Sequence, residues 1–211
     1  MSIPTKQQML DALYLKQGEE RTNAFAASTV AVCGLGGLGS NIAVSLARAG
    51  VGRLILIDFD KVDITNLHRQ QYKAAQVGID KAAALSDNLR EIAPYITLET
   101  HTVRIDSQNA VSLLQNADVI CEAFDNAEAK AMLTNIVLEQ MPDKYLVAAS
   151  GMAGFGSPNE IKTRRISSHF YLCGDGTSDV GDNIGLYTSR VALCAMHEAH
   201  TVLRILAKEF E

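Results

Sequence analysis

A glycine-rich loop between a predicted strand and a predicted helix restricts the fold of this chain more than any other feature. Gly34, Gly36 and Gly39 form a G-x-G-x-x-G pattern after the apolar run of residues 29–33, and a helical run over residues 40–49 follows. In such a turn the first glycine permits a tight bend, the second lets a phosphate approach the backbone, and the third packs the helix on the strand. Free N–H groups at the helix start favour an anion. The loop predicts a nucleotide site, without deciding between NAD and ATP.

Length and composition restrict the class of protein. The chain has 211 residues, of which 47% are hydrophobic and 20% are charged, and its net charge is −5. These values fit one globular domain over residues 1–211, and the lack of a long basic run argues against nucleic acid as a partner. No apolar signal segment is evident, and no stretch approaches the roughly 18 apolar residues of a membrane span. We therefore expect a cytoplasmic protein that does not interact with a membrane.

The order of the predicted elements indicates an α/β fold, with a Rossmann-like, mostly parallel sheet and helices on both faces. Strands are predicted at residues 29–33, 53–58, 96–104, 118–123 and 144–149. Helices are predicted between them at residues 40–49, 80–93, 107–115 and 126–140.

Two further segments flank this core. Residues 1–28 form a predicted helical segment, and residues 151–211 form a small β/α appendage on the same sheet. Within the appendage the residue pattern predicts short strands at 161–166 and 170–172, a mobile loop over 174–186, and a helix over 187–208.

Ligands of such a sheet bind beyond the carboxyl ends of its strands, so the residues just after the strands are the first functional candidates. Asp58 ends the second strand about 20 residues after the glycine loop, which is the position of a ribose-binding acid. Asp60 follows in the same turn. It is either a second ligand or a solvated carboxylate.

Two cations are candidates for phosphate contacts. Arg69 lies in the polar connection over residues 59–79, and its planar guanidinium suits a phosphate. Lys81 follows Asp80, the predicted cap of the next helix, where a cation opposes the helix dipole by up to about 1 kcal/mol. A bound anion would remove that conflict, so the position indicates function. For both residues the alternative is an ordinary surface cation.

Asp125 follows the predicted buried strand over residues 118–123. It either caps the next helix or binds Mg²⁺, which prefers one or two carboxylates together with substrate phosphates. An NAD-dependent enzyme needs the glycine loop and Asp58 but leaves Arg69, Lys81 and Asp125 without a role. ATP with Mg²⁺ gives a role to each of them.

The four cysteines are too dispersed to form a zinc site, because the sequence has no C-x-x-C pair, and no structural zinc is expected. Cys33, Cys121 and Cys194 lie in apolar runs and are predicted to be core thiols. Cys173 lies beside glycines, where a thiol can be exposed and reactive.

The ordered motifs of residues 28–155 resemble the adenylating family of ThiF, MoeB and ubiquitin-activating enzymes. The matching residues are the glycine loop with Ser40, the turn Asp58-x-Asp60-x-Val62, the segment Asn66-Leu67-x-Arg69-Gln70, Lys81, and Asp125-Asn126. Within this family, the short chain and its segments 149–154 and 171–175 are most similar to the compact ThiF-type proteins of thiamine (thiazole) biosynthesis.

The resemblance implies an adenylyltransferase. A small ubiquitin-like sulfur carrier such as ThiS would present its C-terminal Gly-Gly carboxylate, which attacks the α-phosphate of ATP to give an acyl-adenylate and pyrophosphate. By resemblance, Asp58 binds ribose, Arg69 and Lys81 contact the phosphates, and Asp125 binds Mg²⁺. The resemblance also implies that the following residues line the same nucleotide site: Gly34, Gly36, Gly37, Gly39, Asp60, Asn66 and Gln70.

Three further expectations rest on the resemblance. The family's zinc-binding cysteine pairs are missing here. A homodimer is expected, in which an N-terminal cation reaches the partner's site; whether Arg21 or Lys16 does so is left open. Cys173 either accepts the activated carrier as a thioester or acyl-disulfide, or is a structural thiol.

Other functions remain open on the sequence alone. The same chemistry would serve a molybdopterin-synthase carrier, a peptide or a tRNA-attached group. Outside this class, the glycine loop also suits an NAD(P)-dependent oxidoreductase or a non-catalytic nucleotide-binding scaffold.

Overall fold

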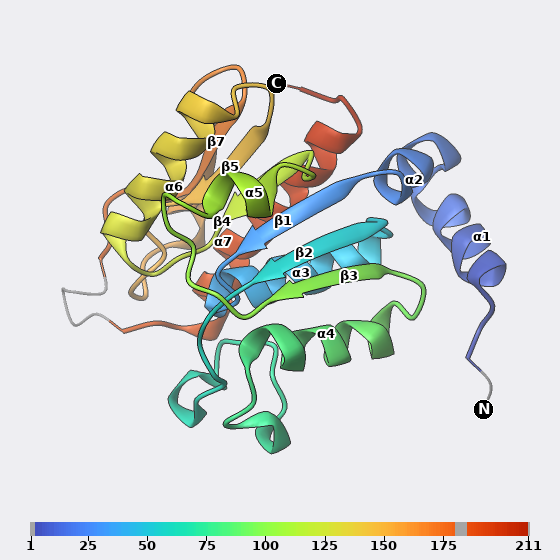
Figure 1. Ribbon diagram of the computed structural model, residues 1–211, viewed down its shortest axis with the longest axis horizontal. Helices are drawn as coiled ribbons and strands as arrows, with labels where there is room; N and C mark the ends of the chain where they lie inside the picture. The colour runs from blue at the N-terminus through green and yellow to red at the C-terminus, as the bar shows by residue number, and fades with distance from the viewer. Residues whose placement is uncertain (1–2, 180–184, 211) are drawn as a thin grey trace.

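Seven strands form one sheet in the order β3-β2-β1-β4-β5-β7-β6 in the computed structural model, which describes residues 3–179 and 185–210 (Figure 1). All neighbouring strands are parallel except β6 and β7, which are antiparallel. The predicted Rossmann-like, mostly parallel sheet is therefore confirmed. The strands are β1 Thr29–Cys33, β2 Arg53–Ile57, β3 Thr97–His101, β4 Val119–Glu122, β5 Tyr145–Ala149, β6 Lys162–Arg165 and β7 Phe170–Gly174.

Helices cover both faces of this sheet (Figure 1). Helices α3, α4 and α7 pack on one face, and α5 and α6 pack on the other. The helices are α1 Lys6–Gln17, α2 Glu19–Ala26, α3 Gly37–Ala49, α4 Lys81–Ile92, α5 Ala110–Leu114, α6 Ala127–Gln140 and α7 Thr188–Leu206. Short 3₁₀ helices are η1 Ile64–Asn66, η2 Ala74–Gln76 and η3 Pro158–Glu160.

The alternation of side chains along β1 divides the core into two layers. Val30 and Val32 pack toward α3 and α7, whereas Ala31 and Cys33 pack toward α5 and α6. Because both faces are covered, the central strands are apolar throughout rather than alternating with polar residues. This pattern explains why the strand predictions for the first half of the chain succeed.

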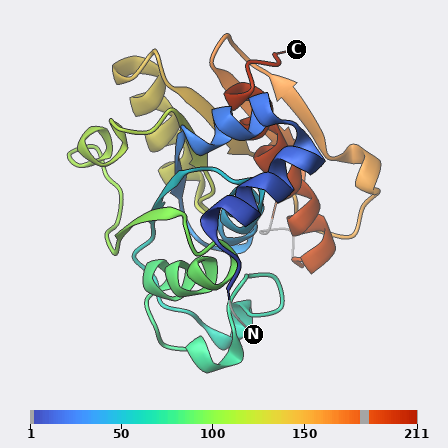
Figure 2. The same cartoon turned by 90° about the vertical axis from the view of Figure 1, so that its right-hand side faces the viewer.

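The first two helices lie at the amino ends of the strands. Gly18, with φ of 87°, separates α1 from α2, so the predicted N-terminal helical segment is two helices rather than one. In Figures 1 and 2 both helices lie at the end of the sheet where β1 begins. They are therefore remote from the carboxyl ends of the strands.

Two predicted elements are shorter in the structure. The helix predicted at 107–115 spans only Ala110–Leu114, because Asp106 and Asn109 form reciprocal side-chain to backbone hydrogen bonds that hold a turn before it. The strand predicted at 96–104 ends at His101, since it pairs only with β2 at the edge of the sheet.

The C-terminal third extends the sheet. The strands predicted at 161–166 and 170–172 form the β6–β7 hairpin, and β7 lies parallel to β5. Part of the loop predicted over 174–186 lies outside the described residues, so its mobility is not tested. Gly174 ends β7, and the N–H groups of Asp175 and Gly176 donate to the carbonyls of Gly151 and Ser150. Among the described residues, no helix combines the length and apolar composition that a membrane span requires.

Candidate active site

A cleft of about 710 Å³ opens along the carboxyl ends of the parallel strands. Its size is within the range of about 300–1,000 Å³ that is typical of small-molecule sites. The structure brings ten of the predicted site residues into its lining, and Gly39 and Cys173 lie outside it. The ten are Gly34, Gly36, Gly37, Asp58, Asp60, Asn66, Arg69, Gln70, Lys81 and Asp125.

The glycine loop is fixed closely by its surroundings. Gly34 has φ of 91°, and a Cβ there would lie 2.8 Å from the Ala123 carbonyl oxygen. A Cβ on Gly39 would lie 1.8 Å from the Gly34 carbonyl oxygen, so α3 can approach β1 only through glycine. Gly36 is open to the cleft, because the nearest atom to its Cβ position is Gln70 Nε2 at 3.7 Å. The loop thus combines a fixed backbone with one open position.

Asp58 ties this loop to the turn after β2. Its Oδ2 accepts a hydrogen bond from the Leu35 N–H at 2.6 Å, and its Oδ1 accepts one from the Asp60 N–H at 2.8 Å. Burial raises the pKa of this carboxyl, and the nearby charge of Lys81 opposes that effect. Since each carboxylate oxygen can accept two hydrogen bonds, Asp58 retains capacity for a ligand hydroxyl.

Lys81 is not the surface lysine of the alternative interpretation. The residue is 6% exposed, and its Nζ lies 2.9 Å from Asp60 Oδ2 in the cleft. Asp80 does occupy the N-cap of α4 as predicted, but its side chain caps no N–H and pairs with Lys61 Nζ at 3.2 Å instead. The start of α4 thus presents a buried ammonium to the cleft.

Arg69 and Asn66 form the adjoining part of the wall. Arg69 Nη2 donates to Asn66 Oδ1 at 2.7 Å, which leaves the guanidinium half-buried beside the cleft. Burial lowers the pKa of Arg69, and the charge of Asp125 opposes that effect. Gln70 is also buried, and its Oε1 has no hydrogen-bond partner within the described chain.

Asp125 lies at the mouth of the cleft with an exposed side chain. Asn126, not Asp125, caps α6, because the Asn126 Oδ1 accepts the Ala129 N–H at 2.9 Å. The cap interpretation of Asp125 is therefore wrong. A single accessible carboxylate suits Mg²⁺ that takes its other ligands from phosphates and water. No group of three His, Cys, Asp or Glu side chains in the described ranges is arranged to bind a metal without such added ligands.

A buried ion pair beneath Asp125 was missed by the sequence analysis. Lys130 Nζ donates to both carboxylate oxygens of Glu122, at 3.1 and 3.0 Å, and to the Ala149 carbonyl at 3.0 Å. Glu122 also accepts the Phe124 N–H at 2.8 Å. The pair thus connects β4, β5 and α6 below the turn that presents Asp125. A glutamate inside an apolar strand is the signal that would have indicated it.

A further part of the cleft lining, called here its base end, carries apolar side chains beside a guanidinium and was also missed. Phe59, Val103 and Ile105 line it, and the Arg104 guanidinium lies 5.5 Å from the centre of the Phe59 ring. An aromatic ring and a guanidinium are both suitable stacking surfaces for a base. These side chains could therefore stack on a base in the cleft.

Of the two possibilities for Cys173, the exposed and reactive thiol is wrong, and the residue is a buried thiol. The residue is fully buried, lies outside the cleft lining, and has its Sγ 3.5 Å from Thr163 Oγ1. Burial raises the pKa of this thiol to about 12, which disfavours the reactive thiolate. The predictions for Cys33, Cys121 and Cys194 as core thiols are confirmed, since all three are buried.

The sequence of this chain is similar to that of known proteins of one family. The ThiF family profile matches residues 9–209. The chain is 37% identical over 127 residues to "Adenylyltransferase and sulfurtransferase MOCS3" of Caenorhabditis briggsae, covering 59% of this chain and 31% of that protein. It is 34% identical over 120 residues to "Sulfur carrier protein adenylyltransferase" of Thermus thermophilus, covering 56% of this chain and 43% of that protein. The matched part thus spans less than half of these relatives.

Solved structures share the fold at low sequence identity. The tRNA N6-threonylcarbamoyladenosine dehydratase TcdA of E. coli, in complex with ATP, superposes with a TM-score of 0.86 at 22% identity, covering 99% of this chain and 98% of that chain. MccB of E. coli with ATP gives a TM-score of 0.75 at 18% identity, covering 99% of this chain and 67% of that chain. The strand order, the glycine loop and the profile match over nearly the whole length agree: this chain belongs to the ThiF family.

Proposed function

We propose that this protein is an ATP-dependent adenylyltransferase that activates the C-terminal Gly-Gly carboxylate of a small ubiquitin-like sulfur carrier. The observation that supports it most is that Lys81, Arg69 and Asp125 line the same cleft as the open position at Gly36. An NAD-dependent enzyme would have no use for two cations and a carboxylate at this place.

The residues have separate roles in the proposed reaction. A carboxylate oxygen attacks the α-phosphorus of ATP, the new acyl–phosphate bond forms, and the bond to the β-phosphate oxygen breaks with release of pyrophosphate. Lys81 and Arg69 stabilise the negative charge that develops on the phosphates, and the glycine-loop N–H groups hold them in place. Asp58 accepts a hydrogen bond from a ribose hydroxyl. Mg²⁺, held by Asp125 together with phosphate oxygens, would neutralise further charge.

The nature of the carrier is the finer part of the proposal. The two relatives named above are adenylyltransferases described as acting with sulfur transfer or a sulfur carrier protein. Among such carriers we propose a ThiS-like protein of thiazole synthesis, on the resemblance of segments 149–154 and 171–175 to the ThiF-type proteins of that pathway. A molybdopterin-synthase carrier is the nearest alternative.

A second candidate substrate is a carboxylate attached to tRNA. Its support is that the TcdA structure matches this chain over nearly the full length of both proteins, whereas the sulfur-carrier relatives match over part of theirs. The net charge of −5 argues against a nucleic-acid substrate, because phosphate contacts usually require a basic surface.

Pyrophosphate exchange separates these possibilities. The purified protein is incubated with ATP, labelled pyrophosphate and, in separate reactions, a ThiS-like carrier, a MoaD-like carrier, or tRNA bearing threonylcarbamoyladenosine. We expect exchange with a Gly-Gly carrier, together with an adenylate adduct on that carrier by intact mass. Exchange with tRNA alone would favour the second candidate. ATP binding without exchange would indicate a scaffold, and NADH binding without ATP binding an oxidoreductase.

We also propose that the protein acts as a homodimer. Arg21 forms an ion pair with Glu209 at 2.6 Å and belongs to α2, which lies at the amino end of β1 (Figure 1). Because the cleft lies at the carboxyl ends of the strands, Arg21 would serve a site only on a partner. Light scattering of the purified protein tests the dimer, and exchange activity of Arg21→Ala and Lys16→Ala separates the two N-terminal cations.

A further inference from the structure

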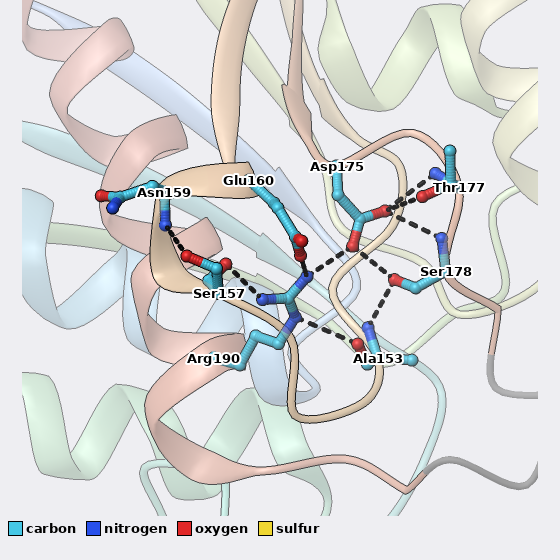
Figure 3. Close-up of polar contacts among 8 residues, drawn as sticks. All are labelled: Ala153, Ser157, Asn159, Glu160, Asp175, Thr177, Ser178 and Arg190. Atoms are coloured by element: carbon cyan, nitrogen blue, oxygen red, sulfur yellow. Dashed lines mark hydrogen bonds and ion pairs between the residues drawn. The ribbon is translucent and has the colours of Figure 1, made fainter.

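A single buried arginine joins three segments behind the cleft. Arg190 lies in the first turn of α7 and is 7% exposed (Figure 3). Its guanidinium donates to four acceptors: the Ala153 carbonyl at 3.0 Å, the Ser157 carbonyl at 2.9 Å, Glu160 Oε2 at 3.2 Å and Asp175 Oδ2 at 2.7 Å. The planar fork of arginine is suited to such a set, whereas a lysine ammonium is a point charge on a flexible stem.

Asp175 extends these contacts into a closed network (Figure 3). Its Oδ1 accepts the N–H groups of Thr177 and Ser178, both at 2.8 Å, and its Oδ2 accepts the Ser178 hydroxyl at 2.7 Å. The Ser178 Oγ in turn accepts the Ala153 N–H at 3.1 Å. Ala153 is thus held through both its carbonyl and its N–H. Burial raises the pKa of Asp175, but hydrogen bonds from Ser178, Thr177 and Arg190 outweigh it and hold the pKa below its ordinary value.

The two loops in this network, residues 150–157 and 174–179, are closely packed against each other. Gly151, at φ of 81°, would place a Cβ 2.0 Å from Asp175 Oδ1. Gly174, at φ of 127°, would place one 2.0 Å from the Ser150 carbonyl oxygen. A shift of either loop therefore requires the other to move.

These loops form the wall of the cleft that the nucleotide residues leave free. Met152, Ala153, Gly176, Thr177 and Ser178 line it, while Arg190 does not. Since the predicted ATP contacts come from the glycine loop, Asp58, Arg69 and Lys81, this second wall is available to the acyl substrate.

We propose that Arg190 is a positioning residue, which acts through Ala153 and Asp175 to hold the acyl-substrate wall of the cleft in register with the nucleotide wall. This inference rests on the proposed adenylation. It predicts that loss of the network weakens use of the acyl substrate while nucleotide binding persists.

The network offers its own matched control. Asp175 and Glu160 both pair with Nη2 of Arg190, but the Asp175 side chain is 7% exposed and that of Glu160 is 55% exposed. A solvated pair contributes little, whereas removing one partner of a buried pair leaves the other charge uncompensated. Asp175→Asn should therefore act like Arg190→Gln, and Glu160→Gln should act like the wild type.

Hydrogen exchange of the full-length variants gives the first test. In Arg190→Gln and Asp175→Asn we expect amide exchange in peptides covering 150–157 and 174–179 to rise about tenfold or more, with peptides of the glycine loop unchanged. Glu160→Gln and Arg190→Lys are measured in the same way. Glu160→Gln should exchange like the wild type, and Arg190→Lys should not restore the slow amide exchange of the wild type. A uniform rise over the whole chain, or no rise in these two loops, would overturn the inference. If Arg190→Gln does not fold, Asp175→Asn decides.

Steady-state kinetics gives the second test. With the Gly-Gly carrier that supports pyrophosphate exchange, Asp175→Asn should raise the KM for carrier about tenfold and leave the KM for ATP within about twofold. Equal effects on both KM values, or a loss only of kcat in proportion to unfolded protein, would contradict the positioning role. If the wild type exchanges with no carrier, the proposed function fails, and the hydrogen-exchange result alone decides whether Arg190 holds this wall.

Discussion

The two walls of the cleft are held by different kinds of contact. On the nucleotide wall, the loop after β1 is fixed by the neighbouring parallel strand β2 and the turn directly after it: the Gly34 N–H donates to the Ile57 carbonyl at 2.9 Å, and the Asp58 side chain accepts the Leu35 N–H at 2.6 Å. On the opposite wall, Arg190 gathers loops that lie 15 to 37 residues before it in the chain. One wall follows from backbone topology and the other from one side chain.

This difference determines how easily each wall can change by amino-acid substitution. In the proposed reaction, the wall built into the parallel sheet would bind ATP, the reactant that is shared by all acyl substrates. A wall that depends on one guanidinium can change by substitution without disturbing the sheet. The zinc-binding cysteine pairs of the resembled family are missing from this sequence, and in the C-terminal third the Arg190 network ties the loops together by charge and hydrogen bonds instead.

The largest expected effect concerns the nucleotide wall. We expect Lys81→Ala to reduce pyrophosphate exchange by about 10²–10³-fold, because it removes a buried cation from the site where phosphate charge develops. Arg69→Ala should have a similar effect. Both variants should retain the circular dichroism spectrum of the wild type.

Lys61→Ala is the matched control for Lys81. Lys61 pairs with Asp80 as Lys81 pairs with Asp60, but the side chain of Lys61 is 68% exposed, whereas that of Lys81 is 7% exposed. Its replacement should leave exchange within about twofold, since exposed ion pairs contribute little. Near-normal exchange by Lys81→Ala and Arg69→Ala would refute the proposed roles of both cations.

A pair of glycine substitutions tests the backbone origin of the nucleotide wall. Gly39→Ala should destabilise the protein by about 3 kcal/mol, because the new methyl group would collide with the Gly34 carbonyl oxygen. Gly36→Ala has room for the methyl group and should fold normally, but it narrows the approach to the loop. We expect its ATP affinity to fall about tenfold, or about 1.4 kcal/mol. Urea unfolding and ATP titration measure the two effects, and equal stability of both variants would contradict the packing argument.

Most of the fold followed from local features of the sequence. Apolar runs of five residues marked the central strands, and Leu38, Ile42 and Leu46 marked the buried side of α3. Lys81 could be selected because its position at a helix start is locally unfavourable. Each of these signals is contained within one element and its ends.

The remaining features depend on residues that are distant in sequence. The nearby glycines left open an exposed Cys173, but β7 lies between β5 and β6, and Gly174 serves the close approach of Ser150 rather than an open loop. Arg190 carried no local signal at all, because its four partners meet only once β5, β7 and α7 are assembled.

A smaller effect is expected at the base end of the nucleotide wall. Arg104→Ala removes the guanidinium that lies over Phe59 and should raise the KM for ATP about threefold to tenfold, given the typical 0.5–1 kcal/mol or more of a cation–π contact. Arg165→Ala is the control, since Arg165 lies 5.7 Å from the centre of the Tyr171 ring and does not line the cleft. Equal KM values for both variants would argue against a base at this end.

The smallest expected effect concerns the helix that supports the second wall. Glu198 lies two turns beyond Arg190 on α7, is fully buried, and within the described chain neither carboxylate oxygen has a hydrogen-bond partner. Burial raises its pKa well above the ordinary 4.5, Lys130 opposes this and Glu122 adds to it. The neighbouring thiols Cys121, Cys173 and Cys194 are buried as well, and burial raises their pKa values.

The raised pKa of Glu198 in the folded protein determines how stability changes with pH. Above about pH 4.5 the unfolded chain releases the Glu198 proton while the folded protein retains it, so stability falls as the pH rises toward the folded-state pKa. Glu198→Gln has no proton to lose, and its melting temperature relative to the wild type should increase from pH 5 to pH 6 by about 2–4 °C. This corresponds to about 1 kcal/mol for a chain of this size, because one proton retained only by the folded state costs up to about 1.4 kcal/mol per pH unit. Glu139→Gln, at an exposed position on α6, should show no such trend. If the melting temperature relative to the wild type rose equally with pH in both variants, Glu198 would be solvated. In that case α7 would support the second wall through Arg190 and would not contain a buried carboxyl without a hydrogen-bond partner.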